Sequence, residues 1–466
     1  MRVSNSIPFV VALAAALPSQ TWAPITTTTV PSVRRAGAMA FDGVNNRLIM
    51  YGGSMPSPSA ILNETWSYNG QWTQLAPAGG ALGRWGHRLV RDTVSNRLVT
   101  FGGRSPVLNG FANDTYTWNG SVWTAQPTVG APSSRYLYGM CYDSTRNVIV
   151  LFGGRTATQT LGDTWELALQ GTTYTWTQKM PALAPAPREE MVMVYDAGFA
   201  RTLLFGGYNS TTNTLFGDTW QYTGTQWTNI TPSSGPSPRY RTSYAYDSVR
   251  QRPLMYGGYD GAQVLTETRE WNGSEWILIA TGAGNLQATE QYAGYDPVRR
   301  KFVTFGGVGT VFSNQTFEYT GSTAGLFSLF GAGCATGSGV SQITAALPPT
   351  LGQTLALTFT NIPTTPGNAY LMLVALGLSN TTWQGLPLPF DLAAIGLGGC
   401  QLVVAADLLR TSAVAAGPTV PFAVSIPNQA ALLNMSFYLQ GVITQITPTN
   451  IGFIGASRGG RALIGN

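Results

Sequence analysis

The stretch YDSTRNVIVLFGG, residues 142–154, is one of six copies of a pattern that decides the fold of this 466-residue chain. It opens on an aspartate suited to starting a turn, continues as an apolar run and ends on two glycines. The first glycine of each pair recurs every 49 to 53 residues, at Gly52, Gly102, Gly153, Gly206, Gly257 and Gly306. Ten residues earlier stands an aspartate, at Asp42, Asp92, Asp143, Asp196, Asp247 and Asp296. Each unit therefore begins with two strands joined by a tight turn.

A second signature follows the glycines in every unit. It is an acid or amide, a threonine and usually an aromatic residue, as in ETWSY at 64–68 and DTWQY at 218–222. A turn comes next, often Asn-Gly or Thr-Gly, which favours a two-residue hairpin. A tryptophan then opens another strand, at Trp72, Trp123, Trp176, Trp227 and Trp276. The pattern predicts four short strands per unit.

The sixth unit lacks this tryptophan, and the start of the chain supplies one. An arginine stands twelve residues after most of the tryptophans, at Arg84, Arg135, Arg188 and Arg239, with Ala288 in the last place. Trp22 stands twelve residues before Arg34 in the same way. We therefore expect the N-terminal segment to complete the last unit and close a ring, which leaves no open sheet edge.

These spacings resemble the kelch repeat of the galactose oxidase-like superfamily, whose units build four-stranded propeller blades. The resemblance covers roughly residues 22–320. It implies an all-β, six-bladed kelch-type propeller over residues 20–320, closed by an N-terminal strand. The departures are Val148, where five of six units have a basic residue, the weaker ETREW signature at 267–271, and Ala288. The regularity of the four arginines predicts structural hydrogen bonds between blades.

Composition supports an all-β protein and bears on localisation. Charged residues are only 10%, and Gly (55) and Pro (28) are abundant, as in chains of short strands and turns. Arg2 and the apolar run at 7–17 resemble a secretory signal peptide over residues 1–19, cleaved upstream of Trp22. We expect a secreted or cell-envelope protein. Basic residues are scattered rather than clustered among aromatics, so nucleic-acid binding is not expected.

Residues 321–466 form a separate part of different composition. Charges become rare and the double-glycine spacing stops, while apolar segments such as 354–362 and 435–443 indicate strands. We predict a β-sandwich, in which export would permit a Cys334–Cys400 disulfide. The layout resembles a C-terminal module of secreted planctomycete-like bacterial proteins, with envelope attachment as one role. Cys141 is interpreted as a small buried residue.

The chain offers little for metal or nucleophilic chemistry. Galactose oxidase binds copper through histidines and tyrosines, and this sequence has a single histidine, His87. One histidine supplies neither that ligand set nor a zinc site. We expect no metal and no cofactor, and we interpret His87 as structural rather than as part of a Ser–His–acid arrangement.

The kelch resemblance implies a ligand site at one mouth of the central channel. Two sets of loops form that mouth in kelch proteins, one just before the innermost strand and one just after the double glycine. The first set carries Arg35, Trp85, Tyr136, Glu189, Tyr240, Arg241, Glu290 and Gln291, and the second carries Arg104, Arg155, Tyr208 and Tyr259. Arginines, tyrosines and carboxylates around a concavity suit a polar ligand such as a glycan or peptide. The alternative is that they are ordinary solvated loop residues.

Three functions remain open from the sequence. The first is a secreted, monomeric, non-catalytic propeller that binds a glycan, peptide or protein. The second is a metal-independent carbohydrate-active enzyme, such as a sugar mutarotase or epimerase, with Glu189, Glu190 or Glu290 as acid or base. Sialic acid mutarotases are six-bladed kelch proteins with a similar lining. The third is a structural protein of the cell envelope.

Overall fold

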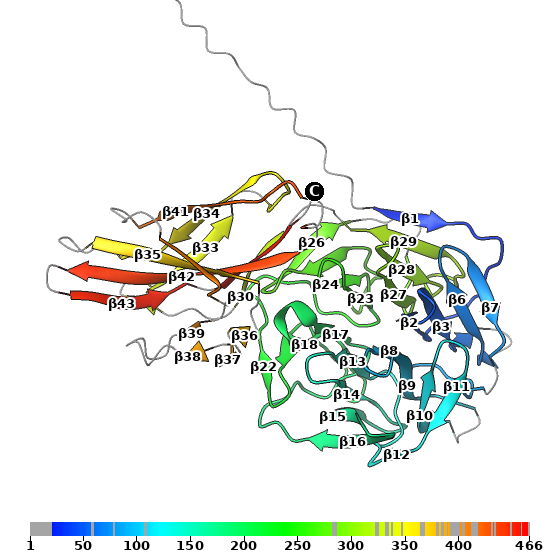
Figure 1. The fold of residues 1–466 in the computed structure, drawn as a ribbon. Helices are drawn as coiled ribbons and strands as arrows, with labels where there is room; N and C mark the ends of the chain where they lie inside the picture. The colour runs from blue at the N-terminus through cyan, green and yellow to red at the C-terminus, as the bar shows by residue number, and fades with distance from the viewer. Residues whose placement is uncertain are drawn as a thin grey trace, which may run out of the picture.

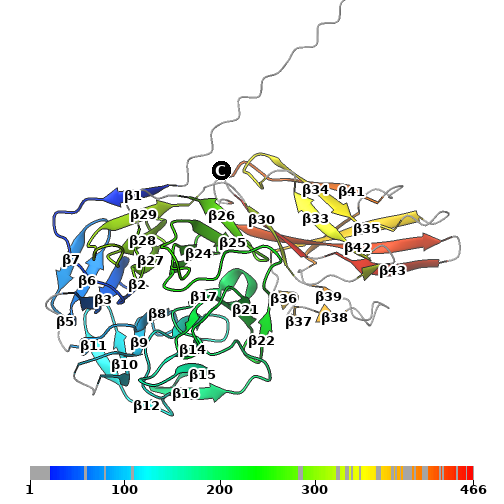
Figure 2. The same ribbon diagram turned by 180° about the vertical axis from the view of Figure 1, so that it is seen from behind.

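The chain is built almost wholly of antiparallel β-sheet (Figures 1 and 2). The computed structural model describes residues 21–321, except 57–59, 78–79, 107–109 and 282–286, and residues 326–464 with further gaps. Helical structure among its described residues is limited to 3₁₀ turns, of which Ala197–Phe199 has defined bounds. No helix in this part of the chain has the length and apolar character needed to cross a bilayer. The all-β prediction is confirmed.

Within 21–321, the described strands form six sheets whose members follow the predicted repeat. Each sheet takes four strands, from first to last: β2 (Ala38–Asp42), β3 (Arg47–Tyr51), β6 (Thr65–Tyr68) and β7 (Trp72–Leu75); β8 (Arg88–Asp92), β9 (Arg97–Gly103), β10 (Ala112–Trp118) and β11 (Trp123–Gln126); β13 (Gly139–Asp143), β14 (Val148–Arg155), β15 (Thr160–Gln170) and β16 (Thr173–Lys179); β17 (Val192–Asp196), β18 (Arg201–Phe205), β21 (Thr219–Tyr222) and β22 (Trp227–Asn229); β23 (Ser243–Asp247), β24 (Arg252–Tyr256), β25 (Thr268–Trp271) and β26 (Trp276–Ala280); β27 (Tyr292–Asp296), β28 (Lys301–Phe305), β29 (Thr316–Thr320) and β1 (Trp22–Ile25). Additional short strands are β12 (Thr128–Val129), parallel to β16, and the hairpins β4 (Ser54–Met55) with β5 (Ala60–Ile61) and β19 (Tyr208–Asn209) with β20 (Thr214–Leu215).

The first strands of the six sheets contact one another in cyclic order. β2 contacts β8, then β8 contacts β13, β13 contacts β17, β17 contacts β23, β23 contacts β27, and β27 contacts β2. Figure 1 shows these strands gathered at the centre, with the later strands of each sheet around them. The sheets therefore surround a common axis.

The N-terminal strand β1 lies at the outer edge of the sheet that the last repeat begins. It pairs antiparallel with β29, with Trp22 opposite Tyr319 and Ile25 opposite Thr316. The Trp22 ring packs against Tyr256 and Phe302, with centroid separations of 4.7 and 5.3 Å. Segments almost 300 residues apart in sequence are thus joined in one sheet.

Tryptophans of the outer strands bind threonines of the neighbouring sheet. In four of the six sheets the indole Nε1 donates to a threonine Oγ1 of the signature that follows the double glycine, whereas Trp176 Nε1 and Trp276 Nε1 are buried without a hydrogen-bond partner. The pairs are Trp22 to Thr268 (2.8 Å), Trp72 to Thr316 (2.8 Å), Trp123 to Thr65 (2.9 Å) and Trp227 to Thr164 (3.0 Å). This explains why both residue types recur, because each bond satisfies a largely buried polar group between two sheets.

The recurring arginines form ion pairs with the acid of the same signature. The pairs are Arg34–Glu64, Arg84–Asp114, Arg135–Asp163, Arg188–Asp218 and Arg239–Glu267, at 2.5 to 2.8 Å, and each arginine side chain is at most 2% exposed. Arg84 also donates to the carbonyl of Gly102, while its own carbonyl accepts from Gly53 of the preceding sheet. The arginine side chains therefore bind within their own sheet, and the contact between neighbouring sheets is made by the arginine backbone carbonyl rather than by the guanidinium.

In the sixth unit both members of this ion pair are replaced together. Ala288 stands in the arginine position and Gln315 in the acid position. A buried charge left without its partner is strongly destabilising, whereas loss of both is tolerated. The loss of the arginine at Ala288 is thus matched by the loss of its acidic partner at Gln315.

The departure at Val148 is compensated nearby. Arg146, two residues earlier, lies 2.8 Å from Asp143 Oδ2 and 2.5 Å from Glu166 Oε1. A basic side chain therefore still neutralises the turn aspartate, although from a different position in the turn.

The C-terminal part contains two larger sheets that share one apolar core. One has the order β30 (Leu326–Phe330), β44 (Gly459–Leu463), β42 (Ser436–Thr447), β35 (Ala369–Gly377) and β40 (Leu408–Thr411), with β43 (Asn450–Ala456) also on β42; the other has β33 (Gln342–Ala345), β34 (Thr354–Thr360) and β41 (Val420–Ser425). Three short two-stranded pairs accompany them: β31 (Ala335–Thr336) with β32 (Gly339–Val340), β36 (Thr382–Trp383) with β37 (Leu386–Pro387), and β38 (Phe390–Asp391) with β39 (Gln401–Leu402). Leu357 and Phe359 of the smaller sheet pack in one cluster with Met372 and Leu439 of the larger.

Two sequence predictions fall outside the described residues. These are the signal peptide at 1–19 and the Cys334–Cys400 disulfide. Cys141 is described and is 6% exposed in β13, with its Sγ 3.4 Å from Thr202 Oγ1. Burial raises the pKa of this thiol to about 12, so it is a packing residue rather than a reactive one.

Candidate binding site

The two predicted loop sets lie side by side at one end of the sheets. In each sheet a residue of the first set pairs with a residue of the second through an isolated antiparallel bridge: Arg35–Ser54, Trp85–Arg104, Tyr136–Arg155, Glu189–Tyr208, Tyr240–Tyr259 and Thr289–Val308. Tyr136 N, for example, donates to Arg155 O over 3.0 Å, and Arg155 N donates back over 2.9 Å. We call these six bridged pairs the rim.

The residue after each first-set member of the rim has a left-handed backbone conformation. These residues are Ala36, Gly86, Leu137, Glu190, Arg241 and Glu290, with φ between 54° and 68°. Five of the backbone N–H groups donate to the carbonyl of the equivalent residue in the preceding sheet. For example, Gly86 N donates to Ala36 O over 2.7 Å, and Ala36 N donates to Glu290 O over 2.9 Å. Non-glycine residues rarely hold this conformation, so the surrounding bonds must impose it. We call these six residues the inner ring.

The inner ring concentrates three charged side chains in one arc. Arg241 Nε lies 3.1 Å from Glu190 Oε1 and 2.9 Å from Glu290 Oε1, and Arg35 Nη1 lies 3.1 Å from Glu290 Oε2. The two carboxylate side chains are 6% and 7% exposed, whereas each arginine is 35% exposed. The acids are therefore covered and paired, and the guanidinium groups face the solvent side.

Glu190 has an unusual protonation equilibrium. Burial raises its pKa to about 7, Arg241 opposes the rise, and the charges of Glu290 and Glu189 add to it. Glu189 is likewise covered, and burial raises its pKa while Arg155, 3.8 Å away, partly offsets the effect. Near neutral pH this arc holds less negative charge than its sequence suggests.

Aromatic rings form most of the rest of the rim. Tyr208 stacks on Tyr240 with centroids 4.9 Å apart, and Tyr240 meets the ring of Tyr259 edge-on at 5.7 Å. Across the rim, Trp85 meets Tyr136 edge-on at 5.3 Å. Such rings offer flat apolar faces and a polar edge.

Arg104 is the exposed cation of the rim. Its guanidinium lies over the rings of Trp85 and Phe111, at 5.8 and 5.4 Å from their centroids. No ion pair among the described residues includes it. The rim thus combines an exposed arginine with partly exposed aromatic rings, a combination that binds polar or anionic groups.

The predicted site residues do not all converge. Arg241 and Glu290, together with Glu190, line a central cavity, whereas Arg104 sits apart from these carboxylates with Trp85 and Phe111. Gln291 points to the channel wall, where its Oε1 accepts a hydrogen bond from Ser243 Oγ at 3.2 Å. The site therefore divides into a rim and an interior.

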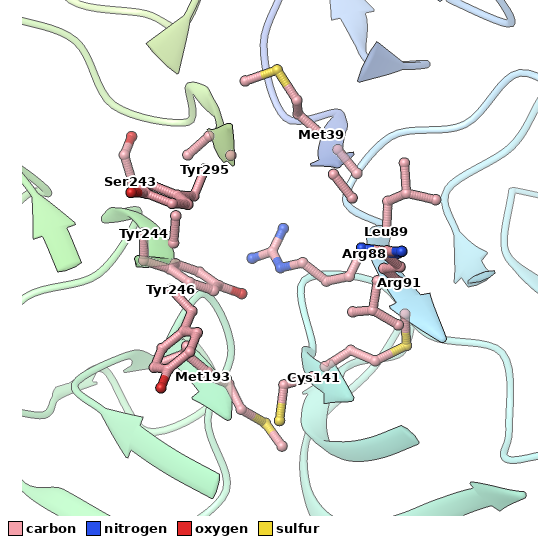
Figure 3. A pocket seen from close by; sticks show the side chains of 18 of the residues that line it. Met39, Arg88, Leu89, Arg91, Cys141, Met193, Ser243, Tyr244, Tyr246 and Tyr295 are labelled. Atoms are coloured by element: carbon pink, nitrogen blue, oxygen red, sulfur yellow. The ribbon is translucent and has the colours of Figure 1, made fainter. Parts of the chain in front are cut away.

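The interior is a channel cavity of about 440 Å³ lined by the six first strands (Figure 3). Its lining includes the residue immediately before each turn aspartate, namely Phe41, Arg91, Tyr142, Tyr195, Tyr246 and Tyr295. Sequence reasoning missed this aromatic layer, although an aromatic residue precedes the aspartate in five of six units.

His87 plays no part in either region. It is fully buried and lies edge-on to the ring of Tyr51, at 5.4 Å between centroids. Burial and the charges of Arg84 and Arg88 hold its pKa well below the usual range. In the described part of the chain, no cluster of three or more His, Cys, Asp or Glu residues has metal-binding geometry.

Comparison with known proteins assigns the repeats. Residues 86–307 match the family description "KLHDC2/KLHL20/DRC7 Kelch-repeats domain". The chain therefore contains a kelch-repeat β-propeller, as the spacing predicted.

Two individual proteins are also similar to parts of this chain. Dynein regulatory complex subunit 7 of Chlamydomonas reinhardtii is 41% identical over 91 residues, which are 18% of this chain and 7% of that protein. The chain thus matches only a small fraction of that relative's length. The solved structure titled "Structure of YjhT" aligns with 65% of this chain and 97% of its own, at 13% identity and a TM-score of 0.46.

Proposed function

We propose that this protein is a non-catalytic binding module that holds a protein or peptide partner on the rim of its propeller. The observation that carries the proposal is the burial of Glu190 and Glu290 behind Arg241 and Arg35, while Arg104 is exposed and Tyr208, Tyr240 and Tyr259 are partly exposed. Such a surface favours a partner segment with carboxylates and apolar side chains. A polar glycan is the alternative ligand for the same surface.

The propeller that carries the rim is proposed to have six blades closed by β1. The cyclic contacts of the first strands support this count. The β1–β29 pairing and the bond from Trp22 to Thr268 support closure by the N-terminal strand. Closure fixes the loops at the channel mouth relative to one another, which a binding site requires.

Two similarities to known proteins agree with a binding role. Kelch repeats suggest a protein-binding propeller, and the relative in Chlamydomonas is by its name a subunit of a complex. Fold alone does not determine function, so the rim residues have to carry the assignment.

A sugar mutarotase or epimerase is the second candidate, and Glu190 favours it. A carboxyl with a pKa of about 7 is poised to act as general acid or base near neutral pH. Against it, Arg241 Nε donates to both Glu190 oxygens, at 3.1 and 3.2 Å. Anomer exchange measured by NMR on sialic acid and galactose decides between them, since the enzyme hypothesis requires acceleration that Glu190→Gln abolishes.

Export and the C-terminal part complete the proposal. We propose that the protein is secreted or attached to the cell envelope, which the basic and apolar residues at 2–17 support. The two C-terminal sheets with their shared core are proposed to form a β-sandwich that serves attachment or stabilisation. A purely structural role would leave the rim without a ligand.

Selection of ligands from a random peptide library and a glycan array tests the proposed function. The intact protein is immobilised and exposed in parallel to a phage-displayed peptide library and a glycan array. We expect enrichment of peptides that carry acidic and apolar residues. Enrichment of glycans alone would replace the partner class, and enrichment of neither would contradict the binding role.

A further inference from the structure

We infer that the channel interior is a second binding site, separate from the rim, for a small organic anion with an apolar body. The inference starts from Arg88, the first residue of β8. Figure 3 shows its side chain extending across the middle of the cavity toward Tyr244. The guanidinium carbon lies 5.9 Å from the centroid of the Tyr244 ring.

Arg88 has donors with no strong acceptor. Its Nη1 donates a long bond, 3.3 Å, to the carbonyl of His87, and its Nε is buried without a hydrogen-bond partner. No carboxylate forms an ion pair with it among the residues that the structure describes. A partly buried guanidinium with an unpartnered, buried Nε carries a desolvation cost that a bound anion would offset.

The other cavity-lining charges lie toward the two ends of the channel. Arg241 is shared between Glu190 and Glu290 at the rim end. Arg91, at the opposite end, donates to Asn96 Oδ1 at 2.9 Å and lies over the ring of Phe41, but its Nε is buried without a hydrogen-bond partner and no ion pair among the described residues includes it. Arg88 lies between these two levels, and neither it nor Arg91 has a carboxylate partner in the described channel, so we expect the ligand to be an anion.

The wall around Arg88 specifies the rest of the ligand. Met39, Leu89, Met140 and Met193 supply flexible apolar surface, and Tyr244 and Tyr246 supply rings. Methionines and tyrosines pack well against an aryl or alkyl group. A planar carboxylate matches the fork of a guanidinium, and a cavity of about 440 Å³ lies in the range of small-molecule sites.

The entrance lies at the end away from the rim. The lining includes Thr93, Ser144 and Ser248, which are exposed in the turns between the first and second strands. At the other end the inner-ring residues are joined to one another by backbone hydrogen bonds. A ligand of this site can therefore enter without passing the rim.

Three matched probes test the inference by titration calorimetry on the intact protein: 4-phenylbutyrate, 4-phenylbutanol and 4-phenylbutylamine. We expect the carboxylate to bind at least tenfold more tightly than the alcohol, and the ammonium compound to bind weakest. Arg88→Met should remove this preference and lower the affinity for 4-phenylbutyrate at least tenfold. Arg97→Met, which removes an arginine outside the cavity, is the matched control and should leave all three affinities unchanged.

Several outcomes would overturn the inference. They are failure of 4-phenylbutyrate to bind, equal binding of the three probes, or a carboxylate preference that persists in Arg88→Met. Because Arg88→Met removes an uncompensated charge, we expect it to unfold at the same or a higher temperature than the parent. If it does not fold, Arg88→Lys decides, since loss of the planar fork should weaken carboxylate binding several-fold, and undiminished affinity would contradict the site.

Discussion

Trp22 Nε1 donates a 2.8 Å hydrogen bond to Thr268 Oγ1, a residue 246 positions further along the chain. The bond repeats in kind those from Trp72, Trp123 and Trp227 to threonines of neighbouring sheets. Trp22 therefore makes for the last sheet the same bond that an internal tryptophan makes for three of the others.

Removing the Trp22 side chain should destabilise the whole propeller. Trp22→Ala loses the indole packing on Tyr256 and Phe302 as well as the bond, and we expect a loss of about 2–4 kcal/mol in the free energy of unfolding. Trp22→Phe keeps a ring and should lose about 1 kcal/mol. Urea unfolding measures both, and an Ala variant as stable as the parent would mean that β1 does not hold the sheet.

The ion pair Arg188–Asp218 provides a test of the matched replacement at Ala288 and Gln315. Arg188→Ala leaves Asp218 without its partner and should cost about 3 kcal/mol. Adding Asp218→Gln recreates the sixth-unit combination and should recover about 1 kcal/mol of that loss. The control Arg97→Ala should change the unfolding free energy by less than about 0.5 kcal/mol.

The four proteins of this double-mutant cycle, measured by urea unfolding, decide the matter. A double variant less stable than Arg188→Ala alone would show that the paired change in the sixth unit is coincidental rather than compensatory.

Glu190 predicts a specific pH dependence of stability. Its pKa rises from 4.5 to about 7 on folding, so between these values the folded protein holds more protons than the unfolded chain. The free energy of unfolding contributed by Glu190 is therefore present below pH 4.5 and is lost as pH rises to about 7. Glu190→Gln removes the titration. The free energy of unfolding of the variant should therefore rise by about 3 kcal/mol relative to that of the parent as the pH increases across this interval.

The measurement is the difference in unfolding free energy between parent and variant at each pH, which cancels the other titrating groups. Glu290→Gln removes the neighbouring negative charge and should move the Glu190 interval to lower pH. A difference that stays constant from pH 4 to pH 8 would refute the assignment.

Much of the fold could be predicted because its signals recur at fixed spacing. The turn aspartates, the double glycines and the outer tryptophans each repeat about every 50 residues, and the structure places each in an equivalent position. The arginine–acid pairs were only half predicted, because the partner of Arg84 is 30 residues distant and becomes evident only in three dimensions.

The site was less predictable for physical reasons. Rim residues could be located because they adjoin repeat landmarks, but the left-handed conformation of Leu137 and Arg241 has no signature in residues of these types. Arg88 stands where the other sheets have Ala38, Gly139, Val192, Ser243 and Tyr292, so no periodic signal marks it. Its importance depends on the absence of a neighbouring acid, which only packing reveals.

The central claim is that the rim binds a partner, and affinity measurements on a selected peptide test it most directly. The comparison pairs Arg104→Ala/Arg155→Ala, at the rim, with Arg97→Ala/Arg300→Ala, which removes the same charge from the opposite end of the sheets. We predict at least a tenfold loss of affinity in the rim variant and less than a twofold change in the control. Equal losses in the two variants, or an undiminished affinity in the rim variant, would contradict the account.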